Sequence, residues 1–446
     1  MSHMWEYLRT RLWFLPAVLV NCAVALALIL IEVDLHADWR ERFPRLFGAG
    51  AEGARGMLST IAGSMITVAG VTFSITVVAL ALASGQYTSR ILRNFMRDRA
   101  THTVLGIFLG VYAYCLIVMR TIRGGDEGAF VPSVAVLGSV VLAFVGIGFL
   151  IFFIHHVSSA IQASSIIAGA ATETLDAVDR LFPANSGEPD NVVANDTAGY
   201  EGTIWTSVPA AQTGFIQRVD LDALLRFAVE SETTVKMERG IGEFATAGAP
   251  LLSIAASAVL DADATRQLNA AYSVGRHRTI VQDAGYGIRQ IVDVALKALS
   301  PGINDTTTAV ECVDYLGAIL SQAARRRIET PCRREQGKLR VMVRGPSFEG
   351  FLDSAFAQIR QNAAANVAVL SQLLQALETV GIASVDPQRR LAVWRHAELI
   401  ANMANRTIAE PSDREAVLIC LDGVWRVVGK GRCARRPEIN PTEDAP

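Results

Sequence analysis

The sequence predicts a membrane protein in which a four-helix transmembrane region precedes a C-terminal cytoplasmic α+β domain, made of a small β unit followed by a helical domain. Three observations predict this fold class. Long apolar segments fill the first third of the chain, a stretch rich in Asn, Asp, Gly and Pro follows, and short strand patterns then give way to amphipathic helices. Hydrophobic residues make up 51% of the 446 residues, which is high for a soluble protein and low for a membrane bundle alone.

The apolar segments are long enough to cross a hydrocarbon core about 30 Å thick. They run from Leu12 to Ile31, Met57 to Ala83, His102 to Met119 and Phe130 to His155. The alternative for the first segment is a cleaved signal peptide. Its apolar run is too long for that, and no small-residue cleavage site follows it. We therefore expect a transmembrane domain over residues 1–156.

Arginines and cysteines indicate the orientation. The segment Arg90 to Arg99 is densely basic, although the loop after the first span also carries arginines. The cysteines form no CxxC pair, which favours neither a disulfide framework nor a zinc site and fits a reducing cytoplasm. They are Cys22, Cys115, Cys312, Cys332, Cys420 and Cys433. We expect a multi-pass protein of the bacterial inner membrane with both termini in the cytoplasm, and no metal site.

The basic segment has a second possible role. As a helix it places Arg90, Arg93 and Arg97 on one side and apolar residues on the other. That arrangement predicts contacts with anionic lipid headgroups. The alternative is an ordinary basic loop on the cytoplasmic side.

The second span carries a polar stripe. Thr60, Ser64, Thr67 and Ser74 fall on one helical face, with Gly63 and Gly70 beside them. The stripe is interpreted either as the lining of a pore or as a face for tight helix packing, and both interpretations stay open. In the third span, Gly106 and Gly110 form a GxxxG pattern, which predicts packing. The spans lack ionised residues, which argues against a proton relay.

The soluble part is expected to contain four regions. Residues 157–200 are a stalk helix and linker, 201–258 a small β-rich unit, 259–410 a mainly helical domain, and 411–446 a C-terminal segment and tail. Strands are expected over Gly214–Val219, Thr233–Met237 and Leu339–Val343, and helices over Leu221–Val229, Asp263–Val274, Asp283–Leu299, Thr306–Arg325, Phe351–Leu377 and Pro387–Ala404. Asn304 or Asp305 is expected to cap the helix that starts at Thr306.

One pattern resembles a cofactor attachment site. Val235-Lys236-Met237-Glu238 is similar to the lysine-bearing hairpin of biotinyl domains. In those domains a Gly-rich closure also precedes the hairpin, whereas here it follows at once and the chain is too short for both halves. We expect no covalent cofactor at Lys236 and assign none elsewhere.

Several motifs together point to a known family. They are Ser59 to Met65, Phe73 to Ile75, Arg93 to Asp98, Val104 to Gly106, Arg278-Thr279 with Gln282-Asp283, and Ala298 to Asp305. They resemble the bacterial predicted-membrane-protein family catalogued as Domain of Unknown Function 2254, over roughly Arg55 to Asn405. A proline usually follows the Asn-Asp pair in that family, whereas Thr306 stands here. The resemblance implies a multi-pass membrane protein with a cytoplasmic domain and brings no catalytic residue.

A polar cluster marks the soluble part. Its members are Arg276, Arg278, Gln282, Asp283, Arg289, Asp293, Asn304 and Asp305. One interpretation is a pocket for a small anion, nucleotide or cation, because arginines suit phosphate or carboxylate groups. The other is a structural network of ion pairs and helix caps. The sequence leaves both open.

These observations favour an oligomeric channel or transport-like conduit that is regulated by its cytoplasmic domain. The alternative hypothesis is a membrane-tethered ligand sensor or scaffold without transport. No enzyme is expected, because no nucleophile–base or metal constellation is recognised. The expected partners are membrane lipid and other copies of the chain, and the net charge of −2 gives no case for nucleic acid.

Overall fold

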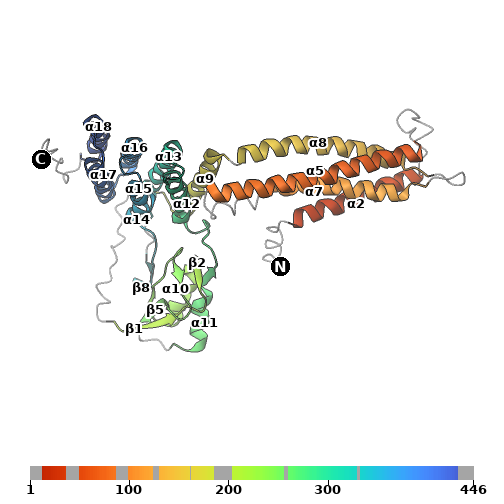
Figure 1. Ribbon diagram of the computed structural model, residues 1–446. Coiled ribbons are helices and arrows are strands. Elements are labelled where there is room, and N and C mark those ends of the chain that lie inside the picture. Colours follow the sequence, from red (N-terminus) through yellow and green to blue (C-terminus); the bar gives the residue numbers. More distant parts are fainter. Residues whose placement is uncertain are drawn as a thin grey trace. The chain divides into compact units, whose positions relative to one another are not determined.

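The computed structural model describes residues 13–36, 50–86, 99–123, 130–160, 162–184, 203–255, 260–328 and 332–429. The chain forms two compact units, Met1–Ile166 and Ile167–Pro446, and the boundary between them falls within helix α9 (Figure 1). We call them the membrane unit and the soluble unit. The predicted headgroup contacts Arg90, Arg93 and Arg97 lie outside the described residues.

The membrane unit is a bundle of long helices, α2 (Phe14–His36), α5 (Ala51–Gln86), α7 (Arg99–Thr121) and α8 (Ser133–Ala160). Each is long and apolar enough to cross a membrane, over Phe14–Asp34, Ala51–Ala81, Ala100–Thr121 and Ser133–Ser159. The four-helix transmembrane region is thus confirmed. At 1.5 Å per residue α5 is roughly 54 Å long, more than a bilayer core requires.

Helix α7 lies at the centre of this bundle and packs against the other three helices. Its side chains Phe108, Tyr114 and Val118 are fully buried. The GxxxG pattern lets α2 approach closely, because a Cβ atom on Gly106 would lie 2.6 Å from a methyl carbon of Leu19. The predicted packing role of this pattern is confirmed.

A carboxylate fixes one end of the bundle. Asp34, near the end of α2, accepts hydrogen bonds from the backbone amides of Val134 and Ala135, each at 3.0 Å. These amides begin α8 and have no partner within their own helix, so Asp34 caps that helix from a neighbouring one. No sequence pattern indicated this role of Asp34.

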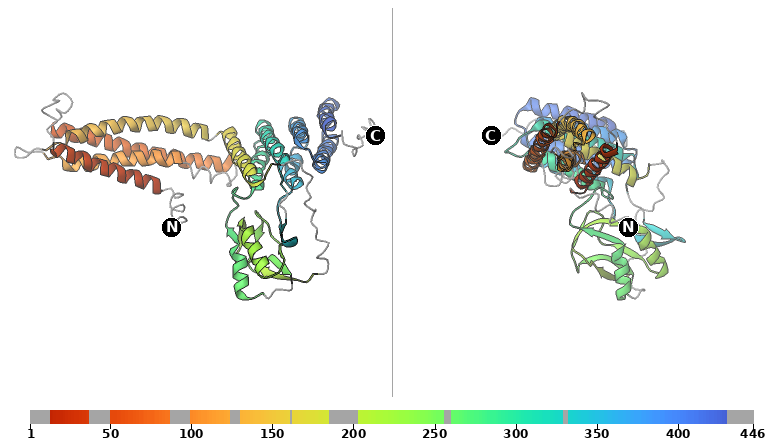
Figure 2. Two further views of the ribbon diagram at one scale, coloured as in Figure 1. Left: turned by 180° about the vertical axis from the view of Figure 1, so that it is seen from behind. Right: turned by 90° about the vertical axis from the view of Figure 1, so that its right-hand side faces the viewer.

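The soluble unit contains two sheets that draw on strands far apart in the chain (Figures 1 and 2). One has the order β1-β5-β3-β8-β7 and the other β4-β2-β6. The strands are β1 (Trp205–Pro209), β2 (Gly214–Val219), β3 (Val235–Met237), β4 (Phe244–Ala245), β5 (Pro250–Ala255), β6 (Tyr272–Gly275), β7 (Arg333–Glu335) and β8 (Lys338–Met342). Residues 201–258 therefore do not form the β unit alone, because β6, β7 and β8 come from the region expected to be mainly helical.

Lys236 lies in the middle of strand β3, not at the tip of a hairpin. Strand β3 pairs antiparallel with β5 on one side and parallel with β8 on the other. The Lys236 ammonium lies 3.1 Å from Glu238 and 5.8 Å from the centre of the Trp205 ring. This placement differs from the attachment lysine of a biotinyl domain.

Helices make up the rest of the soluble unit. They are α9 (Ala163–Leu181), α10 (Leu221–Glu230), α11 (Ala262–Ala270), α12 (Ala284–Ala298), α13 (Thr306–Ala324), α14 (Phe348–Leu352), the π-helical turn η2 (Asp353–Ala357), α15 (Gln358–Asn362), α16 (Val367–Ala383), α17 (Pro387–Thr407) and α18 (Pro411–Val428). Asp305 caps α13 by accepting from the amide of Thr308 at 3.0 Å, as predicted.

Two predicted helices need correction. The helix expected over Asp263–Val274 ends at Ala270, because Tyr272–Gly275 pairs with β2. The helix expected over Phe351–Leu377 is broken near Ala365, whose backbone has φ +62°. A new helix then starts, because the side chain of Asn366 accepts from the amide of Val369 at 3.2 Å.

Candidate ligand-binding cavity

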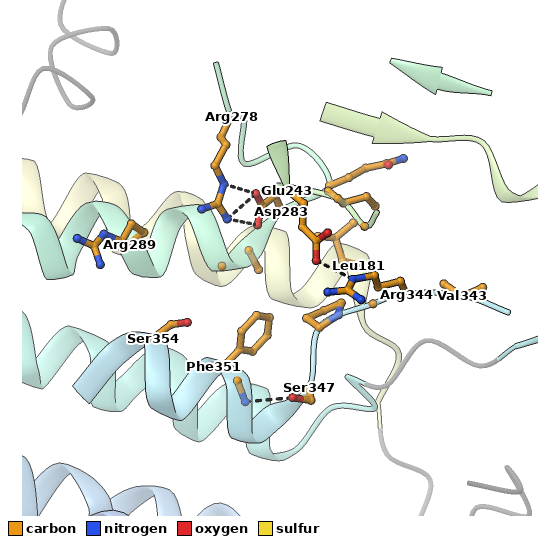
Figure 3. A pocket seen from close by; sticks show the side chains of 18 of the residues that line it. Leu181, Glu243, Arg278, Asp283, Arg289, Val343, Arg344, Ser347, Phe351 and Ser354 are labelled. Atoms are coloured by element: carbon orange, nitrogen blue, oxygen red, sulfur yellow. Dashed lines mark hydrogen bonds and ion pairs between the residues drawn. The ribbon is translucent and has the colours of Figure 1, made fainter. Parts of the chain in front are cut away.

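A cavity of about 940 Å³ lies within the soluble unit (Figure 3). Its wall combines the end of α9, the turn between β3 and β4, the start of α12, the segment after β8, and the run α14–η2–α15. These segments are far apart in sequence. The cavity therefore exists only when the sheets and the helices of this unit are assembled.

The cavity wall contains an ion pair between Arg278 and Asp283 that is joined by two hydrogen bonds. The Arg278 Nε and Nη2 atoms donate to the two carboxylate oxygens at 2.8 and 3.1 Å. Asp283 also caps α12 by accepting from the amide of Tyr286 at 3.0 Å, and the Arg278 guanidinium lies 5.3 Å from the Tyr286 ring centre. Burial raises the pKa of Asp283, against the opposing effect of Arg278.

A glycine makes room for this pair. Gly242, in the turn between β3 and β4, has φ +82°. A Cβ atom at this position would clash with a carboxylate oxygen of Asp283 and would lie 2.9 Å from Arg278 Nη2. The turn can therefore rest against the ion pair only because residue 242 has no side chain.

A second ion pair joins the same turn to the segment after β8. Arg344 Nε donates to Glu243 Oε1 at 2.7 Å. Next to it, Gly240 allows close backbone contact, because a Cβ atom there would lie 2.6 Å from the Arg344 carbonyl oxygen. The Arg344 side chain is 55% exposed.

A third arginine lines the cavity from α12. Arg289 Nε lies 2.7 Å from Asp293 Oδ1, and Arg289 Nη1 donates to Gln358 Oε1 at 2.7 Å. Figure 3 shows Arg278, Arg289 and Arg344 at separate places in the cavity lining. Each of the three guanidinium groups is held by an acidic side chain.

The opposite wall is the helical run that contains the π-helical turn. Ser347 caps α14 by accepting from the amide of Gly350 at 3.0 Å, and Phe351 adds an apolar surface. Asp353 and Ser354 belong to η2 and also line the cavity. Single π-helical turns inside α-helices occur frequently at functional sites.

A buried histidine contacts the π-helical turn of this wall. His396 of α17 is 4% exposed, and its Nε2 atom lies 3.1 Å from Asp353 Oδ1. Burial lowers the pKa of His396, while the Asp353 carboxylate opposes that shift.

The structure divides the predicted polar cluster. Arg278, Gln282, Asp283 and Arg289 line the cavity, and Asp293 holds Arg289 from behind. The other members, Arg276, Asn304 and Asp305, are exposed and do not line it. Gln282 also supports the sheet, because its side-chain oxygen accepts from the amide of Val219 at 3.1 Å.

Several lining residues were missed. Glu243, Arg344, Ser347 and Phe351 are separated from the predicted cluster by tens of residues, and no local pattern links them to it. The close spacing of Gly240 and Gly242 was a usable signal, because paired glycines in a turn indicate close backbone approach.

The polar stripe of α5 lies on the exposed face of that helix. Thr60, Ser64 and Thr67 are exposed, and each hydroxyl donates at 2.8 Å to the carbonyl four residues earlier. A Cβ atom on Gly63 or Gly70 would have no neighbour within 4 Å among the residues that the structure describes. The buried face of α5 is the opposite one, lined by Leu58, Ala62, Met65 and Ala69. The described part of the membrane unit therefore leaves the stripe uncovered.

In the part of the chain that the structure describes, no group of three or more His, Cys, Asp or Glu side chains is arranged to hold a metal ion.

Residues 9–379 match the family described as "Predicted membrane protein (DUF2254)". The chain belongs to this family. Every residue that lines the cavity lies inside the stretch that matches the DUF2254 family, whereas α17 and α18 lie beyond it.

Relatives cover almost the whole chain. An uncharacterised protein of Mycobacterium tuberculosis (strain CDC 1551 / Oshkosh) is 36% identical over 420 residues, which cover 93% of this chain and 80% of the relative. An uncharacterised protein of Mycobacterium bovis is 35% identical with the same coverage. No solved structure matches this DUF2254 protein.

Proposed function

We propose that this protein is a membrane-anchored sensor, whose soluble unit binds a small molecule and reports its presence through α9. It acts as a binding protein and not as an enzyme. The observation that carries this proposal is the position of Leu181 and Phe182. They are the last residue of α9 and the residue after it, and both form part of the cavity wall.

Specific contacts connect α9 and the residue after it to other elements of the soluble unit. Phe182 meets Phe351 of the opposite wall edge to face, with ring centres 6.0 Å apart. Thr174 is fully buried, and a Cβ atom on Gly287 of α12 would clash with its hydroxyl. Asp179 accepts hydrogen bonds from Gln322 and Arg326 of the α13 end.

Chain connectivity supplies the route for a signal. Helix α8 ends at Ala160 and α9 begins at Ala163, so the α9 helix directly follows the last membrane helix. A ligand that binds one conformation of the cavity wall better than another shifts the population of the two. Because Phe182 is part of that wall, the shift acts on α9.

The location of the protein is part of this proposal. The chain is a membrane protein. We infer further that the membrane is the bacterial inner membrane, that both termini face the cytoplasm, and that membrane lipid is a partner. The cysteine pattern and the basic segment at 90–99 support that orientation.

A cavity-filling variant tests ligand binding. We expect that screening the full-length protein in detergent against small molecules will find compounds that raise its thermal midpoint. Ser354→Trp should abolish this stabilisation by filling the cavity. The control Ser412→Trp changes an exposed serine away from the cavity and should keep it. Hits that stabilise both variants equally would contradict the proposal.

A second candidate function is an oligomeric conduit, favoured by the uncovered polar stripe of α5. In this hypothesis copies of the chain assemble so that the stripes face a shared path. The internal hydrogen bonds of Thr60, Ser64 and Thr67 equally suit tight helix packing, because they satisfy the hydroxyls without water. The sensor is therefore the proposal that the geometry supports better.

Ion flux through liposomes tests the conduit. Replacing Ser64, Thr67 and Ser74 together with Leu should abolish flux if the stripe lines the path. Thermal unfolding of the variant shows whether the bundle stays intact. Flux that is the same in the variant and in the original protein would exclude the stripe as a pore lining.

A further inference from the structure

We propose that the ligand of this cavity is an organic anion, whose phosphate or carboxylate group binds terminal nitrogens of the arginines that line it, with Arg344 among them. This inference rests on the proposed sensor function and names the ligand class for the same cavity.

Three of these arginines still have hydrogen-bond donors to offer, namely Arg278, Arg289 and Arg344. A guanidinium carries five N–H donors. In all three arginines an acidic side chain engages Nε, namely Asp283, Asp293 and Glu243 respectively. Arg278 also uses Nη2 and Arg289 also uses Nη1. Among the described residues, most terminal N–H groups in this set have no other partner, and they suit the paired oxygens of phosphate or carboxylate.

The carboxylates also preorganise the arginines. Each ion pair fixes a long side chain before the ligand arrives, so less conformational freedom is lost on binding. The pairs also offset part of the charge on these three arginines, through Glu243, Asp283 and Asp293, while a fourth arginine, Arg333, also lines the cavity. Binding therefore draws on the hydrogen-bond geometry of the guanidinium donors as well as on positive charge. This arrangement favours oxyanions over a spherical ion such as chloride.

The remaining wall indicates what the rest of the ligand is like. Val219, Met237, Ile241, Val343 and Phe351 add apolar side chains to several parts of the lining. A volume of about 940 Å³ is far larger than a phosphate ion and lies in the range of sites for organic ligands. A ligand with an acidic group and an apolar body could bind the arginines with the first and the apolar side chains with the second.

Three probes test this inference by calorimetry on the full-length protein in detergent. They are phenyl phosphate, which has both parts, and its two fragments, phenol and inorganic phosphate. We expect phenyl phosphate to bind more tightly than either fragment. Arg344→Met should weaken it by about tenfold or more, because a charge-assisted hydrogen bond is lost. Arg266→Met changes an arginine on α11 outside the cavity and should leave binding unchanged.

Three results would contradict the inference. Equal binding of phenol and phenyl phosphate, no binding of phenyl phosphate at millimolar concentration, or unchanged binding in Arg344→Met would overturn the inference. Arg344 is half exposed, so this variant should fold, and its thermal midpoint checks that. Adding phosphatidylglycerol to phosphatidylcholine nanodiscs identifies the source of the anion. Competition with phenyl phosphate would assign the same chemistry to a lipid headgroup, and no competition to a soluble compound.

Failure of this inference and failure of the sensor can be told apart. A neutral compound that stabilises the protein but not Ser354→Trp would leave the sensor standing and refute the anion. Binding of phenyl phosphate without any change in α9 would support the anion and refute the sensor.

Discussion

Arg278, Asp283 and Gly242 form the tightest arrangement in the cavity. The carboxylate of Asp283 serves two purposes, since it holds Arg278 and caps α12. The Gly242 turn covers both side chains at a distance that only glycine permits. Ion pair, helix start and turn therefore depend on one another, and a change at any of them disturbs the cavity.

Gly242→Ala and Gly248→Ala form a matched pair that tests this dependence. The two glycines have nearly the same backbone angle, φ +82° and +83°, but a Cβ atom on Gly248 would meet no described atom within 4 Å. The strained backbone lowers the free energy of unfolding of both variants, but only Gly242→Ala also displaces the ion pair. Urea unfolding should show Gly242→Ala to be less stable by roughly 1–3 kcal/mol beyond the loss at Gly248. Equal losses would mean that the turn does not press on the ion pair.

At the residue scale the sequence indicated part of the cavity and not the rest. Arg278 and Asp283 are five residues apart, so their proximity follows from local spacing. Glu243 and Arg344 are 101 residues apart, and their pairing depends on β8 lying parallel to β3. No property of either residue alone predicts that pairing.

At the scale of elements, the end of α9 and the π-helical turn η2 are the two parts of the cavity wall that matter most for the proposed function. Helix α9 crosses α12 closely at Thr174 and Gly287. The stalk helix predicted within residues 157–200 corresponds to α9, but no sequence pattern indicated that its end lines a cavity. The same holds for the sheets, in which β6 and β8 pair with strands distant in sequence.

The α9–α12 crossing can be tested with two substitutions. Gly287→Ala should destabilise the protein by roughly 1–3 kcal/mol, because the new methyl group overlaps Thr174. Adding Thr174→Ala removes the closest of the clashing atoms and should restore part of the loss. The free energies of unfolding of the four proteins in this double-mutant cycle give the coupling. Additive effects would show that the helices do not meet at these residues.

Acidification should weaken the wall at η2. The pKa of His396 is lowered from 6.5 by burial and by Arg360 and Arg395, and Asp353 opposes the shift. Between the lowered pKa and about 6.5 the unfolded chain binds more protons, so stability rises with pH and is lost as pH falls through that window. His396→Gln should flatten the dependence of the thermal midpoint on pH. The control His277→Gln changes an exposed histidine and should leave this pH dependence as it is. Equal pH profiles for the two variants would show that His396 is not the source of the pH dependence.

At the scale of the whole molecule, four apolar helices anchor a soluble unit that contains a preformed cavity. The sequence predicted this division well, because long apolar segments and amphipathic helices are distinct signals. It could not predict the cavity, which arises where segments distant in the chain meet. The proposed sensor connects the two parts of the molecule through α9, the segment in which the boundary between the units falls.

Hydrogen–deuterium exchange of the full-length protein in nanodiscs, with and without phenyl phosphate, tests the central claim most directly. The sensor predicts slower exchange in the cavity segments 240–243 and 343–354 and, at the same time, altered exchange across residues 174–182 of the α9 region. Arg344→Met should lose both effects together. Protection of the cavity segments with unchanged exchange at 174–182 would contradict the sensor.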